Sequence, residues 1–147
     1  MVGAPGNRMA VAEVRLAVLA MEGMRLESQL VDASARLLRA SGRQAACEAA
    51  CAVAASRWEA AERAARYDEG VGPEGQTVAA LEAGRAERLA AMTGLRPELD
   101  AAQQAVVSAA AEVALAEAEE LSARQALERH RRVVGRRQAA GRSGESG

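Results

Sequence analysis

The most constraining feature of this chain is a repeat of apolar residues at alternating steps of three and four, which runs from Met9 to Ala65. Gly23 and Gln44 are its two interruptions. An apolar heptad sustained for about eight repeats is typical of a coiled-coil helix. The seam consists of Met9, Ala12, Leu16, Leu19, Gly23, Leu26, Leu30, Ala33, Leu37, Ala40, Gln44, Cys47, Cys51, Ala54, Trp58, Ala61 and Ala65.

A second seam of equal length follows a turn-forming segment. Residues 68–77 contain three Gly and one Pro, which indicates a loop. The heptad then resumes at Val78 and continues to Val134, with Arg85, Arg88, Glu120 and His130 as its non-apolar members. Two helices of similar length joined by a short loop are expected to fold back on each other. The predicted fold is therefore all-α, a long antiparallel two-helix coiled-coil hairpin.

The predicted boundaries follow from the two seams. Helix 1 is expected at about 9–67 and helix 2 at about 78–138, within one domain that spans 9–138. Residues 1–8 and 139–147 are expected to be disordered. Pro97 lacks a backbone N–H and clashes with the preceding turn, so it predicts a kink or break near 93–97.

The register between the helices can also be predicted. Pairing positions whose numbers sum to 146 places Leu30 opposite Ala116 and Ala40 opposite Val106, so that large residues meet small ones. The same pairing places Trp58 opposite Arg88 and Ala61 opposite Arg85.

Composition argues against a thick globular core and against an enzyme. The chain has 38 Ala, one Trp, one Tyr and no Phe, so it can bury a thin seam but few large side chains. It lacks a glycine-rich phosphate loop followed by Lys, and its single His leaves no nucleophile–base set. We expect no catalytic residue, no cofactor and no small-molecule substrate.

Cys47 and Cys51 are the two cysteines, four residues apart on one helix face. A metal or redox pair needs further ligands, and His130 lies far along the sequence, so small buried hydrophobes are the preferred interpretation and no metal site is expected. The N-terminal residues lack the apolar core of a signal peptide, and no apolar run is long enough for a membrane span. A cytoplasmic location without membrane insertion is therefore predicted.

Charge is distributed unevenly along helix 2. Residues 76–123 contain three Arg and eight acidic residues, whereas residues 124–147 contain seven Arg and two acidic residues. This basic end either complements the dipole at the end of the helix or binds an acidic surface, anionic lipid or nucleic acid. Its candidate partner-binding residues are Arg124, Arg129, Arg131, Arg132, Arg136 and Arg137.

The loop end carries a second candidate set, Trp58, Tyr67, Arg85 and Arg88. Two interpretations stay open there. Arg88 can stack on the Trp58 indole while its charge reaches water. Alternatively, this end is imperfectly closed and binds a partner through Trp58 and Tyr67.

The length, the mid-sequence loop and the Arg-rich stretch from Glu119 to Arg132 resemble the central-stalk proteins of type III secretion and flagellar export (the FliJ/YscO type). The resemblance covers about residues 9–138 and is architectural and compositional. It implies a bacterial, non-enzymatic stalk, associated with virulence, at the cytoplasmic face of a secretion apparatus. The paired termini are then expected to bind the hexameric secretion ATPase and the loop end to face the export-gate protein. The alternative is a nucleic-acid-associated or structural scaffold coiled coil that uses the Arg-rich end.

Overall fold

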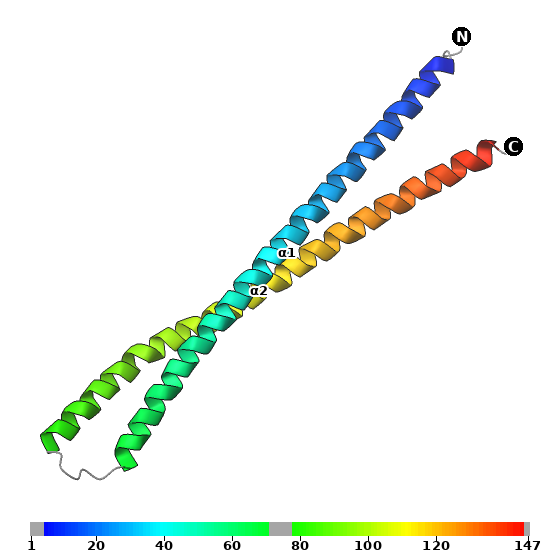
Figure 1. The fold of residues 1–147 in the computed structure, drawn as a ribbon. Helices are drawn as coiled ribbons and strands as arrows, with labels where there is room; N and C mark the ends of the chain where they lie inside the picture. The colour runs from blue at the N-terminus through cyan, green and yellow to red at the C-terminus, as the bar shows by residue number, and fades with distance from the viewer. Residues whose placement is uncertain (1–4, 71–77, 146–147) are drawn as a thin grey trace. The chain divides into compact units, whose positions relative to one another are not determined.

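The computed structural model describes residues 5–70 and 78–145, which form two helices and contain no strand (Figure 1). Helix α1 spans Pro5–Gly70 and helix α2 spans Val78–Glu145. The two helices pack against each other, so the predicted all-α helical hairpin is confirmed. Neither described helix holds an apolar stretch of the length and hydropathy that crossing a bilayer demands.

Both helices extend beyond their predicted limits. Residues 5–8 and 139–145 were expected to be disordered but are helical, as are residues 68–70 of the predicted loop. Pro5 suits the first turn, because its fixed φ matches the helix and its missing N–H would have had no intrahelical partner. The remaining parts of the predicted disordered ends and loop, residues 1–4, 71–77 and 146–147, lie outside the described residues.

Helix α2 is continuous through Pro97, so the break that the sequence allowed near 93–97 is absent, whereas a kink there stays a prediction. Pro97 has no N–H to donate to the carbonyl of Thr93, so this turn loses one backbone hydrogen bond. The Thr93 hydroxyl donates to the carbonyl of Leu89 at 2.7 Å, a bond that does not replace the one lost at the Thr93 carbonyl. Flanking turns keep the helix continuous, but its backbone is weakened at this point.

The chain divides into two compact units, which we call the terminal unit (residues 1–39 and 114–147) and the middle unit (residues 40–113). Each contains a segment of α1 packed against a segment of α2. The buried apolar residues are Leu26, Ala33, Ala116 and Leu127 in the terminal unit, and Ala40, Leu99 and Ala109 in the middle unit. All of them lie at positions of the two predicted seams, so the heptad assignment is confirmed for these residues.

The register differs from the prediction by one heptad. In the terminal unit Gly23 lies against His130, and Arg36 forms an ion pair with Glu119 at 3.4 Å. In the middle unit Arg43 pairs with Glu112 at 3.2 Å, and Arg96 lies over the ring of Trp58. The numbers of these pairs sum to 153, 155, 155 and 154, whereas the predicted seam pairs sum to 146. The predicted pairs Leu30–Ala116, Ala40–Val106, Trp58–Arg88 and Ala61–Arg85 are therefore wrong.

A shift of seven residues leaves the apolar seams facing each other, which explains why the seam pattern could not exclude it. The two registers differ in the contacts of the residues that flank the seam. With a sum of 155 for the flanking positions, Arg36 and Arg43 each face a glutamate. The predicted register would place Arg43 opposite Ala105 and leave that arginine without an acidic partner. Because Arg36 would face Glu112 in the predicted register, the observed register gains one exposed ion pair over the predicted one, a small stabilisation.

Candidate partner-binding surfaces

The seam of the terminal unit opens toward the chain termini. Leu26 and Leu127 are buried, with 8% and 5% of their surface exposed, but Leu16 is 64% exposed although it belongs to the same seam. Met9, the first residue of the seam, is exposed to a similar extent. Figure 1 shows that, within this unit, the distance between α1 and α2 increases toward the chain termini. The apolar seam residues nearest the termini are thus available to another molecule.

An open hollow of about 520 Å³ lies between the two helices at this point, and we call it the terminal groove. Helix α1 contributes one wall from residues 16–27, and α2 contributes the other from residues 127–138. Within it Gly23 faces His130, and a Cβ at Gly23 would lie 3.0 Å from Nε2 of that imidazole. The apolar lining consists of Leu16, Leu19, Ala20, Met24, Leu127 and Val134.

Arginine side chains surround this apolar lining. Arg131 and Arg137 line the groove from α2. A neighbouring hollow of about 710 Å³ shares Leu16, Leu19 and Arg137 with it and adds Arg8 and Arg15 from α1. Glu27 is the one acidic residue in the lining of either hollow among the described residues. The combination suits a segment that is apolar on one face and acidic at its edges.

All six arginines predicted for the terminal end are exposed on α2. Arg124 forms an ion pair with Glu120 one turn earlier, whereas the other five form no ion pair with a described residue. The structure brings Arg131 and Arg137 together at the groove and leaves Arg129, Arg132 and Arg136 outside its lining. Sequence reasoning identified these arginines but missed the groove, because continuing the seam to Met9 implied closed packing there.

The predicted loop-end set is not brought together in the same way. The guanidinium of Arg96, not Arg88, lies 5.5 Å from the centroid of the half-buried Trp58 ring. Arg88 instead lies against Gly84, with Nη2 3.1 Å from where a Cβ of that glycine would be. Arg85 is exposed, and the side chain of Tyr67 lies outside the described part of the structure. The cation–π interaction therefore exists, but its arginine lies eight residues beyond the predicted Arg88.

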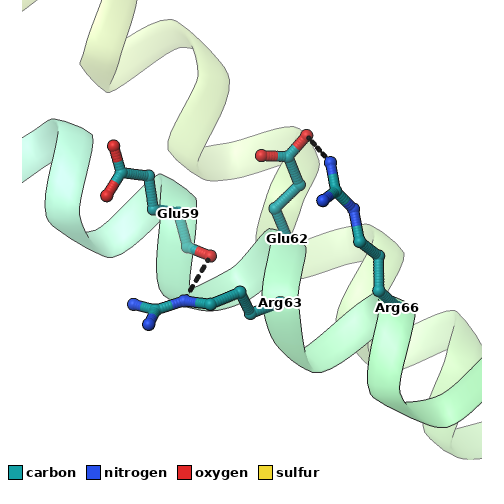
Figure 2. Close-up of polar contacts among 4 residues, drawn as sticks. All are labelled: Glu59, Glu62, Arg63 and Arg66. Atoms are coloured by element: carbon teal, nitrogen blue, oxygen red, sulfur yellow. Dashed lines mark hydrogen bonds and ion pairs between the residues drawn. The ribbon is translucent and has the colours of Figure 1, made fainter.

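Arginines in the last turns of α1 are engaged by their own helix (Figure 2). Arg66 pairs with Glu62 at 3.5 Å, and Nε of Arg63 donates to the carbonyl of Glu59 at 3.4 Å. Both are contacts between residues four apart, which are neighbours on a helix surface. These local contacts contrast with the terminal end, where five arginines are available for an external acceptor.

Cys47 and Cys51 are free thiols, and both are half-buried. Within residues 5–70 and 78–145, no three His, Cys, Asp or Glu side chains gather closely enough to hold a metal ion. The two cysteines occupy the predicted seam, where a small apolar side chain is sufficient.

Comparisons with family models, with curated proteins and with solved structures returned no match.

Proposed function

We propose that this chain is a non-enzymatic helical hairpin that docks on a partner protein through its terminal unit. The observation that carries the proposal is the terminal groove, an apolar hollow with Arg131 and Arg137 in its lining. Apolar seam side chains that continued packing of the hairpin would have buried are exposed there. They lie beside arginines that form no ion pair with a described residue. Such a surface favours an acidic, amphipathic segment, since apolar contact supplies affinity and charge steers its approach.

The partner that best fits the architectural resemblance is a hexameric export ATPase of a bacterial type III secretion apparatus. In this proposal the hairpin is a central stalk at the cytoplasmic face, and its terminal end enters the ATPase ring. The positive field of the arginines attracts an acidic ring mouth and raises the rate of encounter. Contact with an export-gate protein is then assigned to the middle unit, where Trp58 is already half-covered by Arg96.

The proposal is tested by binding of the full chain to the secretion ATPase of the same organism, measured by calorimetry and by ATP turnover. The double variant Arg131→Glu, Arg137→Glu reverses both groove arginines and is expected to abolish binding and any stimulation of turnover. The matched control is Arg57→Glu, Arg63→Glu, which makes the same charge change in the middle unit and should bind normally. Trp58→Ala should also retain ATPase binding. Equal loss in the test pair and the control pair would contradict docking at the groove.

A second candidate function is supported by the arginines outside the groove. Arg129, Arg132 and Arg136 are exposed and form no ion pair with a described residue, so they are able to contact phosphates. Nucleic-acid binding through phosphates weakens steeply as salt rises, because bound counterions are released on association. Tight binding of a DNA or RNA duplex with a steep salt slope, together with no binding to the ATPase, would replace the stalk by a nucleic-acid-associated coiled coil. Failure of both assays would leave the scaffold alternative.

A further inference from the structure

Helix α1 carries a second apolar stripe that the hairpin seam does not use. It also advances by alternating steps of three and four, and from Ala10 to Ser56 it contains no charged residue. Its large members, Val14, Met21, Met24, Val31 and Leu38, are all 61–76% exposed. Within the terminal unit the stripe consists of Ala10, Val14, Ala17, Met21, Met24, Ser28, Val31, Ala35 and Leu38.

The stripe lies on the side of α1 that faces away from α2. At 3.5 residues per turn, its axis is roughly 155° around the helix from the axis of the seam that contains Leu26 and Ala33. The two faces are separated by charged positions such as Glu27 on one side and Arg25 and Arg36 on the other. Met24 lies at the border and also lines the terminal groove. An uncharged face repeated every heptad is the pattern of a helix that packs against two neighbours.

We propose that a second copy of this chain covers the stripe, with the two α1 helices antiparallel and related by a twofold axis. The pairing places together residues whose numbers sum to 59. Met21 then faces Leu38 of the second copy, Met24 faces Ala35, and Ser28 faces Val31. Of these three layers, the last two combine a large side chain with a smaller one, and a twofold axis repeats each contact, as an isologous interface requires.

Charged residues beside the stripe form attractive pairs at the centre of this arrangement. With the sum of 59, Arg25 of each copy lies beside Asp32 of the other, which gives two reciprocal attractive pairs, while Glu13 lies beside Glu48 near the two ends of the overlap, which gives two like-charge pairs. In the unpaired chain Arg25 reaches Glu22 at 3.8 Å with both side chains about half exposed, and Asp32 is exposed and forms no ion pair with a described residue. Both groups are therefore available to a second copy.

Neighbouring alignments are less favourable. Shortening the overlap by one heptad, to a sum of 52, places Arg25 against Arg25. Lengthening it, to a sum of 66, places Arg25 against Arg39 and Asp32 against Asp32. A sum of 45 forms no charge pair beside the stripe. A parallel, in-register pair places Glu27 beside Asp32. Among these alignments, the sum of 59 gives the longest overlap in which like-charge pairs do not outnumber attractive pairs, and its attractive pairs lie at the centre.

The stripe and the terminal groove are tested by different substitutions, so this inference goes beyond the proposed function and can fail or succeed separately. The experiment is sedimentation equilibrium of the full chain at low salt, with helicity checked by circular dichroism. Wild type is expected to form a dimer. Arg25→Asp and Asp32→Arg should each weaken the dimer at least about tenfold, because each places like charges together twice. The double variant Arg25→Asp, Asp32→Arg exchanges the charges and should restore the dimer. Glu117→Arg, an exposed charge change on α2, should leave it intact.

Cross-linking measures the register directly. In chains whose Cys47 and Cys51 are replaced by Ser, a mixture of Met24→Cys and Ala35→Cys chains should form the mixed disulfide in preference to either homodimeric one, since a disulfide needs Cα atoms within about 7 Å. A wild-type chain that stays monomeric at every concentration overturns the proposal. So does a dimer that neither reversal weakens, or one in which Met24→Cys cross-links mainly to itself.

Discussion

The terminal unit and the middle unit are built on the same heptad seam, yet they expose very different surfaces. Most exposed large apolar side chains of the described residues belong to the terminal unit, whereas Val53, Leu89 and Val107 are those of the middle unit. Ionic contacts differ as well, since the last turns of α1 hold Arg63 and Arg66 in local contacts while five terminal arginines form no ion pair with a described residue. The difference shows that one seam can serve two purposes. It closes the hairpin at layers of both units, and toward the termini it also leaves large apolar side chains exposed.

The largest expected effect is the all-or-none outcome of cross-linking within one chain, which tests whether both units share the observed register. In chains without Cys47 and Cys51, Ala40→Cys with Val113→Cys should form a disulfide in the middle unit. Leu30→Cys with Ala123→Cys should do the same in the terminal unit. Both pairs sum to 153, and Cα atoms must lie within about 7 Å for the bond to form. The control pairs Ala40–Val106 and Leu30–Ala116 sum to 146, and efficient cross-linking of these pairs would restore the register predicted from the seam alone.

Core truncation in the terminal unit should give the next largest effect. Leu127→Ala removes a buried side chain that is 5% exposed and is expected to lower the free energy of unfolding by about 2–3 kcal/mol. Leu121→Ala, on the exposed surface of the same helix, should change it by less than about 0.5 kcal/mol. Urea titration followed by circular dichroism provides the measurement. Equal changes in the free energy of unfolding at the two positions would mean that Leu127 is not part of a packed core in the terminal unit.

In the middle unit, Pro97→Ala should stabilise the protein by about 1–2 kcal/mol. The substitution supplies an N–H for the carbonyl of Thr93 and removes the clash of the proline ring with the preceding turn. Hydrogen exchange of the amides at 93–101 should slow in the variant, while amides of the terminal unit keep their wild-type rates. A loss of stability would contradict the gain expected from restoring this backbone hydrogen bond.

The smallest effect is expected for the cation–π contact of the middle unit. A double-mutant cycle with Trp58→Ala and Arg96→Ala should give a coupling free energy of about 0.5–1 kcal/mol. The same cycle with Arg88→Ala should give a coupling close to zero, since the Arg88 guanidinium lies against Gly84. Coupling to Arg88 but not to Arg96 would contradict the register in this unit.

Helicity, the hairpin and the seam positions could be predicted from the sequence because heptad periodicity is a local signal. Every buried apolar residue, from Leu26 to Leu127, was assigned to a seam in advance. The register could not be read from the same signal, because moving one helix by seven residues returns each seam position to an equivalent one. The charges beside the seam give only a weak signal, since Arg36 and Arg43 both pair with glutamate in the observed register and Arg36 alone would do so in the predicted one.

The candidate sites also divide into features that a local sequence signal predicts and features that depend on how the helices pack. Arg131 and Arg137 were predicted from charge alone, and the structure places them beside an apolar groove. The groove itself depends on where the helices separate, and a continuous heptad does not reveal that point. Arg96 was missed as the partner of Trp58 because the predicted register placed Arg88 there. The outer stripe of α1 was also missed, although its spacing was present in the sequence.

The order of the contacts along the hairpin has a consequence for how the molecule assembles. The separation in sequence between partners grows about threefold from Trp58 and Arg96 to Gly23 and His130. Closing the longer loop costs only about 1 kcal/mol more than closing the shorter one, because the entropic cost grows with the logarithm of loop length. Pairing of the two helices should therefore start in the middle unit and proceed toward the termini, with little additional loss of chain entropy for each seam layer. The terminal layers are the last to join and the first to open, so a partner can capture them while the middle unit remains folded.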